Sequence, residues 1–191
     1  MHIFNSSGKK KIDYKVLYFE TGEKKGDFTP FELKVICDYP YFSDSVNAET
    51  EIYRRVDKIS GGFSLPAVFT ERLTEADIVN SGQVGAEPVI KIECTQAGVY
   101  SGGITIYNNK NGKYLHLIIN LLSGEIITFD VKNRQISSNL RENCYGILSD
   151  SSVLSEFIIE KGINHLQLIN RNDGETVKAS IYYDNLYVEA V

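Results

Sequence analysis

The sequence predicts a mainly β protein, built as an antiparallel β-sandwich or jelly roll with a small β attachment at its N-terminal end. Three observations lead to this fold class. The chain has 12 Tyr and 9 Phe among 191 residues, and aromatic side chains favour strands. Short segments alternate apolar and polar residues, as strands with one buried face do. Gly, Asn and Pro separate these segments at short intervals, which is typical of sandwiches.

The segment Gly124–Asp130 lies between two apolar runs and is interpreted as a turn followed by a strand. Gly124 supplies the positive φ that a tight reversal needs. Ile127, Phe129 and Val131 then point to one side of an extended chain and give it a fully apolar face. The apolar segments on either side, residues 114–122 and 144–149, resemble it, so we expect neighbouring strands there.

The N-terminal part shows the same pattern. Residues 13–20 and 28–37 are predicted strands joined by a polar loop, and Pro40 ends the second because proline cannot donate to a ladder. Residues 43–59 contain good helix formers, but their apolar positions fit a helix poorly, which favours an edge strand. Gly61 and the glycine after it mark a change of composition. We therefore expect two domains, residues 1–58 and 59–191.

Short extended segments continue through the larger domain. Proline is tolerated at the start of a strand, and Pro88 precedes one whose Ile90, Ile92 and Cys94 share a face. Asn111 and Gly112 form a strong turn signal. The extended segments expected after residue 60 are 63–68, 78–82, 87–94, 104–107, 153–159, 163–169 and 177–188, with a hairpin turn at 172–174.

Charge and composition exclude several kinds of partner. The formal net charge of −5 argues against a nucleic-acid binder, which needs a basic surface. The longest basic run, Lys9–Lys11, is interpreted as a solvated end. No stretch is apolar enough to span a membrane, and residues 1–11 lack the apolar core of a signal peptide.

The sequence gives little sign of catalysis or of a cofactor. Cys37, Cys94 and Cys144 are far apart and form no Cys-x-x-Cys pair, so we expect buried free thiols and no metal site. No nucleophile elbow is present. The acidic pairs Glu49/Glu51 and Asp150/Glu156 are the remaining acid–base candidates, and we rank an enzyme last. We predict no catalytic residues, no metal and no cofactor.

An interaction site is the more plausible kind of function. Tyr107, Asn109, Tyr114 and His116 lie around the turn that contains Gly112, where they could face a partner or a saccharide. The alternative is an ordinary hairpin loop with satisfied side chains. Two interpretations are open for the tyrosines of the β-rich half: they line an aromatic sugar site, or they are core and edge residues of the sheets. These tyrosines are Tyr100, Tyr107, Tyr114, Tyr182, Tyr183 and Tyr187.

A set of motifs follows in a fixed order along the chain. They are the segments Ile78–Gly82, Glu87–Ile92, Asn120–Glu125, Phe129–Arg134, Phe157–Asn164 and Ile181–Tyr187. This order resembles the C-terminal domain of the distal tail protein family of long-tailed phages. Upstream, residues 37–42 are similar to the segment that closes that family's N-terminal domain.

The resemblance implies a galectin-like β-sandwich at a tail hub, located in the virion tail after synthesis in the bacterial cytoplasm. It implies a structural protein that forms a ring, a hexamer in this family, and joins other tail proteins of the tail tip or baseplate. The alternative function is a carbohydrate-binding module for host cell-surface saccharide. Ser123 and the Glu160–Lys161 pair depart from the family pattern. The N-terminal part is shorter than the ring-forming domain of the family, which predicts a fragment, a split reading frame or a shortened variant.

Overall fold

The computed structural model consists of two compact units. It describes residues 2–5, 8–44, 48–52, 54–57, 70–94, 103–144, 146–170 and 177–189. The smaller unit contains residues 1–46 and 186–191, and the larger unit contains residues 47–185. The division predicted between residues 58 and 59 lies outside the described residues. Residues 48–52 belong to a sheet of the larger unit.

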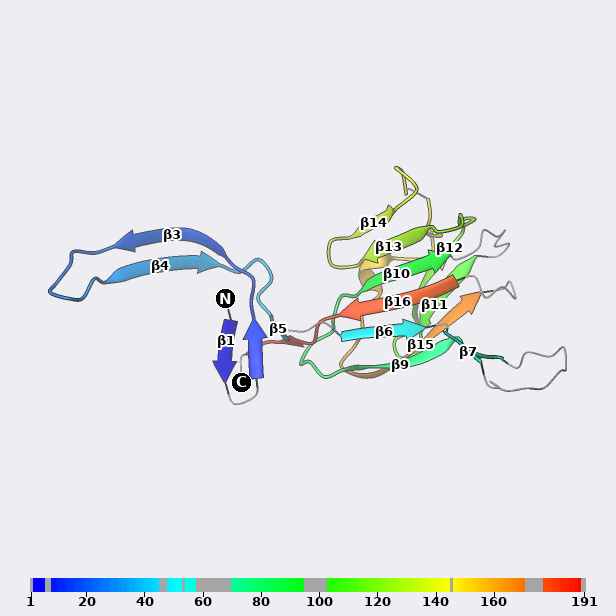
Figure 1. The fold of residues 1–191 in the computed structure, drawn as a ribbon, viewed down its shortest axis with the longest axis horizontal. Coiled ribbons are helices and arrows are strands. Elements are labelled where there is room, and N and C mark those ends of the chain that lie inside the picture. The colour runs from blue at the N-terminus through cyan, green and yellow to red at the C-terminus, as the bar shows by residue number, and fades with distance from the viewer. Residues whose placement is uncertain are drawn as a thin grey trace. The chain divides into compact units, whose positions relative to one another are not determined.

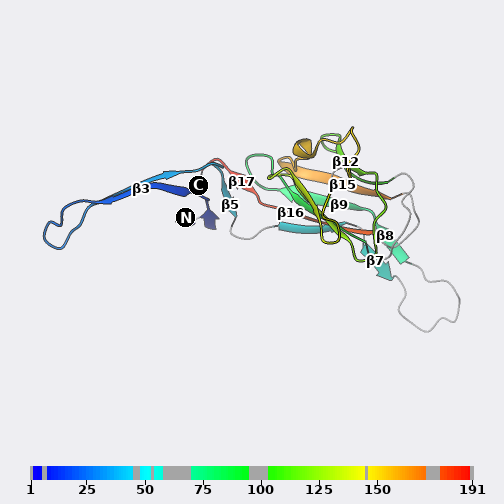
Figure 2. The same cartoon turned by 90° about the horizontal axis from the view of Figure 1, so that it is seen from above.

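The larger unit is an antiparallel β-sandwich, as the sequence predicted, and its two sheets form separate layers (Figure 2). The five-stranded sheet has the order β14 (Gln135–Ser138), β13 (Ile126–Asp130), β10 (Val89–Cys94), β16 (Val177–Tyr183) and β6 (Ala48–Ile52). The four-stranded sheet has the order β12 (Lys113–Leu117), β11 (Ile104–Asn108), β15 (Gly162–Asn170) and β9 (Glu75–Asn80). A separate two-stranded ribbon pairs β7 (Arg54–Asp57) with β8 (Thr70–Leu73).

Side-chain alternation builds the core between these sheets. Ile90, Ile92 and Cys94 of β10 are fully buried, as predicted, and so are Ile127 and Phe129 of β13. The facing sheet contributes its own alternating set, which includes Ile104, Ile106, Leu115, Leu117, Leu166 and Leu168. Burial of this apolar surface is the main stabilising term for the unit.

Some predicted segments differ in the structure. The run 114–122 is a strand only to Leu117, because the chain then leaves the sheet. Residues 153–159, expected to be extended, contain a 3₁₀ turn, η1 (Leu154–Glu156). The predicted strand 63–68 and the predicted hairpin at 172–174 lie outside the described residues.

The smaller unit combines a sheet with a two-stranded ribbon (Figure 1). Its sheet has the order β1 (His2–Asn5), β2 (Gly8–Lys11), β5 (Phe42–Asp44) and β17 (Leu186–Tyr187). The ribbon pairs β3 (Lys15–Thr21) with β4 (Phe31–Ile36). Strands β1 and β17, which are far apart in the sequence, therefore belong to the same sheet.

Candidate interaction surfaces

The outer face of the four-stranded sheet is the side turned away from the sandwich core. Residues on it alternate with the buried ones along each strand. The register places Glu75, Gln167, Tyr107 and Tyr114 in a single row that crosses all four strands. We define the outer face by the eight residues Glu75, Asp77, Thr105, Tyr107, Tyr114, His116, His165 and Gln167.

The structure brings together three of the four predicted site residues. Tyr107 lies directly opposite Tyr114, and His116 lies opposite Thr105, so all three share the outer face. Their side chains are half-buried. Asn109 is exposed in the turn that follows β11, where its backbone N–H donates to the carbonyl of His165. Asn109 therefore lies beside the face rather than in its row.

His116 has its own structural partners. Its Nδ1 lies 2.7 Å from Thr105 Oγ1. Gly103, at φ +73, packs against the ring, and a Cβ at this position would lie 2.7 Å from His116 Cε1 and collide with the Leu117 carbonyl oxygen. Only glycine fits this close approach and this backbone conformation. The ring of His116 is thus held in a fixed orientation.

Glu75 and Asp77 form a polar cluster with His165 that sequence reasoning missed. His165 Nδ1 lies 2.7 Å from Asp77 Oδ1, and its Nε2 lies 3.1 Å from Glu75 Oε2. Glu75 Oε1 also accepts a 2.8 Å hydrogen bond from Gln167 Nε2. The hydrogen bond with Asp77, followed by that with Glu75, raises the pKa of His165 above 6.5. The sequence signal for this cluster was the i, i+2 spacing of Glu75 and Asp77 in one strand and of His165 and Gln167 in another, which places each pair on one face.

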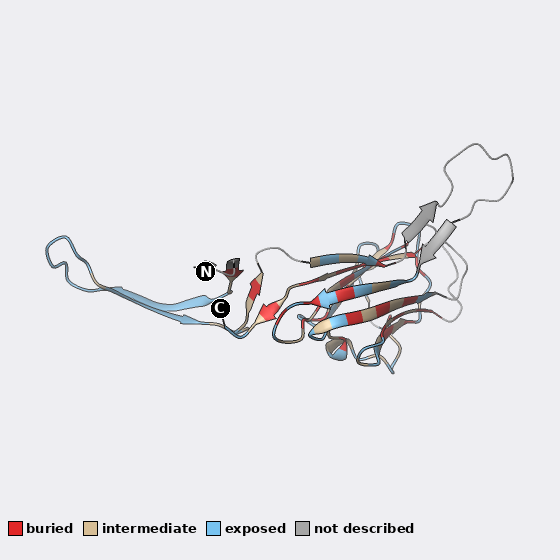
Figure 3. Ribbon diagram, turned by 90° about the horizontal axis from the view of Figure 1, so that it is seen from below, coloured by how far each residue is buried: buried red, intermediate tan, exposed pale blue. Residues whose placement is uncertain are grey.

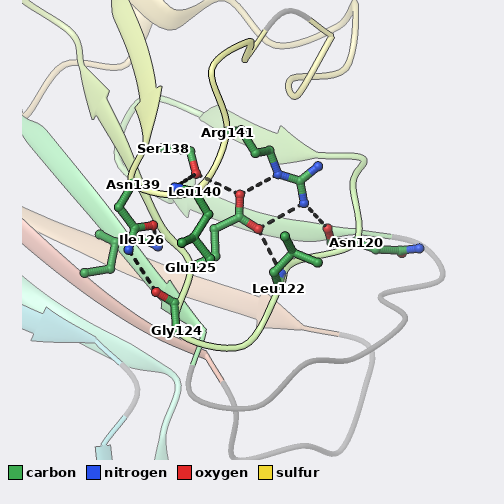
Figure 4. A network of polar contacts seen from close by, with 9 residues as sticks. All are labelled: Asn120, Leu122, Gly124, Glu125, Ile126, Ser138, Asn139, Leu140 and Arg141. Carbon is green, nitrogen blue, oxygen red and sulfur yellow. Dashed lines mark hydrogen bonds and ion pairs between the residues drawn. The ribbon is translucent and has the colours of Figure 1, made fainter.

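Glu125, in the turn before β13, is completely buried and forms an ion pair with Arg141 (Figure 4). Arg141 Nε and Nη2 donate to its two carboxylate oxygens at 2.5 and 3.0 Å. The Leu122 N–H and the Ser138 hydroxyl donate at 2.8 Å each. Burial alone would raise the pKa of Glu125, but these hydrogen bonds outweigh it and hold the pKa below 4.5. The network fixes the loops on both sides of β13.

Buried asparagines fix the remaining turns of the motif series. Asn80 Nδ2 donates to the carbonyls of Val84 and Ile159, while its Oδ1 accepts from the Gly82 N–H. Asn164 Nδ2 donates to the Glu160 carbonyl at 2.6 Å and the Gly162 carbonyl at 3.0 Å. Gly124 and Gly162 both adopt positive φ, at 74° and 87°. These asparagines and glycines of the motif series therefore hold the turns of the fold in place.

The ribbon of β3 and β4, which we call the arm, has one apolar face. Cross-strand pairs Val16–Val35 and Phe19–Leu33 lie on this face. The rings of Phe19 and Phe31 are 6.0 Å apart there. A bulge between Val16 and Tyr18 puts Val16 and Phe19 on the same side although they are three residues apart. These side chains are 42–67% exposed, and Figure 3 shows both strands exposed along their length.

The other face of the arm is mixed in character. It presents Tyr18 opposite Lys34, Glu20 opposite Glu32, and Lys15 opposite Ile36. Within the described residues, β3 and β4 pair only with each other. A two-stranded ribbon is marginally stable in water without a third element against its apolar face. The apolar face of the arm therefore has the character of a surface that another chain covers.

Lys10 is buried and Lys11 is half-buried, so the interpretation of the basic run as a solvated end was wrong for these two residues. The side chain of Lys9 lies outside the described part of the chain. Lys10 Nζ lies 2.6 Å from Asp44 Oδ1 and 3.5 Å from the centre of the Tyr187 ring. Burial alone would lower the pKa of Lys10, but Asp44 and Tyr187 outweigh it and raise the pKa above 10.5. The contact joins β2, β5 and β17, whose residues are too distant in sequence for a pattern to reveal it.

The other sequence candidates have ordinary structural roles. All three cysteines are free thiols; Cys94 is buried as predicted, while Cys37 and Cys144 are only half-buried. Glu51 forms a 2.5 Å ion pair with Lys178, and Glu156 a 2.6 Å pair with Lys113. Among the described residues, no three His, Cys, Asp or Glu side chains gather as metal ligands. No helix in that same part of the chain is long and apolar enough to cross a membrane.

Comparisons with known proteins agree with this architecture. A family model described as the siphovirus-type tail component, C-terminal domain, matches residues 81–187, more than half of the chain. The fold is similar to that of SPP1 Dit (gp 19.1), described as a paradigm of the hub adsorption apparatus in phages infecting Gram-positive bacteria. The TM-score is 0.64 at 9% identity, over 93% of this chain and 60% of Dit. Comparison with curated proteins gave no match.

Proposed function

Because the chain belongs to the siphovirus-type tail component family, we propose that it is a structural hub protein at the distal end of a phage tail. In this role it assembles with copies of itself into a ring, with a hexamer as the expected stoichiometry. The larger unit then serves as an attachment platform for host-adsorption proteins. No catalytic step is part of this function. The observation that carries the proposal is the exposed apolar face of the arm.

The arm supports self-assembly for a physical reason. Phe19, Phe31 and Leu33 are 60%, 67% and 46% exposed, and exposed apolar side chains at this density mark association surfaces. Covering them with a second copy would remove apolar area from water and give the ribbon the packing partner that it lacks. In a ring, each arm would contact the next copy, so every apolar face is covered.

Substituting one phenylalanine tests this proposal. Phe19→Ser should raise the concentration at which half of the chains are assembled at least tenfold, measured by size-exclusion chromatography with light scattering over a range of concentrations. Burying a phenylalanine contributes about 1.5–3 kcal/mol, which corresponds to about tenfold or more in association. Tyr18→Ser is the matched control, since Tyr18 lies on the opposite face of the arm. Equal losses in both variants would contradict the role of the apolar face.

Saccharide binding is a second candidate function, favoured by the outer face. Tyr107 and Tyr114 form a half-buried cross-strand aromatic pair. Gln167 and Glu75 supply donors and acceptors in the same row, and His165 does so in the adjoining row. Aromatic rings with polar groups beside them are suited to sugar rings. A glycan array probed with the unaltered chain and with Tyr107→Ala tests this function. Binding that Tyr107→Ala leaves unchanged would exclude this face.

A further inference from the structure

Strand β14 is an edge strand, and some of its main-chain N–H and C=O groups face the side that has no neighbouring strand. It pairs with β13 on one side only. The Asn139 N–H donates to the Ile126 carbonyl at 3.2 Å, which makes Thr128–Ser137 and Asp130–Gln135 the hydrogen-bonded pairs of the ladder. Ile136 lies between these pairs. Its N–H and C=O therefore point toward the free edge of the sheet.

A groove of about 600 Å³ is lined by the first two residues of β14. One wall consists of Arg134, Gln135 and Ile136, and the other is the returning segment 142–144. Ile136 and Cys144 are half-buried and pack on the sandwich core, so they provide apolar surface inside the groove. Arg134 and Glu142 provide one positive and one negative charge, which favours neither sign in a ligand.

The turn that joins the two walls is fixed by several polar contacts. Arg141 donates to the buried carboxylate of Glu125 and to the Asn120 carbonyl at 2.6 Å. Asn139 contributes two further hydrogen bonds, from Nδ2 to the Gly124 carbonyl and from the Ile126 N–H to its Oδ1. Walls held in this way would need little reordering when a ligand binds, which lowers the free-energy cost of binding.

We propose that this groove binds an extended polypeptide segment of a neighbouring tail protein, which adds to β14 as a further strand. Main-chain groups of Ile136 would pair with the incoming backbone, as in other cases of strand addition. Apolar side chains at alternate positions of the segment would rest on Ile136 and Cys144. The inference deepens the proposed platform function and rests on it for the class of partner.

The binding test uses overlapping 12-residue peptides from the other tail proteins of the same phage, with the full chain. Binding is measured by fluorescence anisotropy. Hydrogen exchange then locates the site on the unaltered chain. We expect at least one peptide to bind and to slow exchange at residues 135–138 and 142–144. Absence of binding by every peptide, or protection confined to other segments, would overturn the proposal.

A proline substitution separates main-chain pairing from other contacts. Ile136→Pro removes an edge N–H that does not pair with β13, a position where proline is tolerated. Losing this one donor and leaving a carbonyl of the peptide unpaired should weaken peptide binding about tenfold. Ile136→Val keeps the N–H and should retain affinity within about fourfold, since one methylene is worth about 0.8 kcal/mol. Equal affinities of the two variants would contradict strand addition.

Light scattering on the same samples distinguishes this inference from the proposed function. Ile136→Pro should self-assemble like the unaltered chain, because β14 lies in the larger unit and the arm in the smaller one. Peptide binding by a chain that remains monomeric would refute the proposed ring but support the proposed strand addition at β14. A chain that forms the ring but binds no peptide would support the ring and refute the strand addition. Thermal unfolding of Ile136→Pro verifies that the variant is folded.

Discussion

At the scale of single residues, the Glu125–Arg141 pair is the most consequential contact in the larger unit. Glu125 is fully buried, while the Arg141 side chain is 29% exposed. A carboxylate without water depends entirely on its protein donors, and here Arg141, Ser138 and the Leu122 N–H supply them. The ion pair thus offsets the cost of burying the carboxylate and holds the loops on both sides of β13 in one conformation.

Glu125→Gln should destabilise the chain by about 3 kcal/mol, the lower end of the range for breaking a buried ion pair. The partial exposure of Arg141 places the expected cost at that lower end. Urea-induced unfolding measures the difference. Glu156→Gln is the control, because Glu156 pairs with Lys113 at the surface, and it should change stability by less than about 1 kcal/mol. Similar costs for both variants would contradict the structural role of Glu125.

The stability provided by Glu125 should depend on pH in a definite direction. Its folded-state pKa lies below the ordinary 4.5, so its contribution is fully present above about pH 4.5. The contribution is lost as the pH falls through the folded-state pKa. The difference in unfolding free energy between the unaltered chain and Glu125→Gln should therefore shrink below pH 4.5. A difference that grows on acidification would refute this assignment.

At the scale of elements, strand β17 depends on a residue from the other end of the chain. Lys10 of β2 contacts Asp44 of β5 and the ring of Tyr187 in β17. A buried cation between a carboxylate and an aromatic face holds three strands together. Because β17 has only two residues, side-chain contacts of this kind must supplement its few ladder hydrogen bonds.

Lys10→Met should release β17 while the sandwich stays intact. The methionine keeps much of the apolar stem but loses the ion pair and the contact of the ammonium group with the ring. Hydrogen exchange at residues 186–187 should become at least about tenfold faster, equivalent to about 1.4 kcal/mol of lost local stability. Residues 89–94 of β10 serve as the internal control and should be unchanged. Unchanged exchange at 186–187 would show that the lysine does not retain the strand.

Elements with local alternation could be predicted from the sequence. Ile90, Ile92, Ile127 and Phe129 were assigned correctly because a strand of period two needs no knowledge of its partners. In the arm, the alternation of Phe31, Leu33 and Val35 with polar residues also predicted the faces of β4. The side chains of β3 could not be assigned in this way, because the bulge after Val16 shifts the alternation. The 3₁₀ turn η1 was missed because three residues give no periodic signal.

At the scale of the whole molecule, the prediction of a β-sandwich and of the tail-component family was correct. Three predicted site residues were also brought together on one face, since Tyr107, Tyr114 and His116 belong to adjacent strands. Glu75 and Asp77 were missed because β9 joins that sheet beside β15, which lies about ninety residues away in sequence. The ligand of the face cannot be predicted from strand patterns, because pairing positions side chains without specifying what they bind.

The mass of the unaltered chain in solution tests the central claim of self-assembly through the arm. Light scattering across a range of concentrations should find one dominant species whose mass is an integer multiple of 21.5 kDa, with six copies expected. A ring with every arm covered is a closed assembly, so the mass should not increase further with concentration. A 21.5 kDa monomer at every concentration would contradict the account.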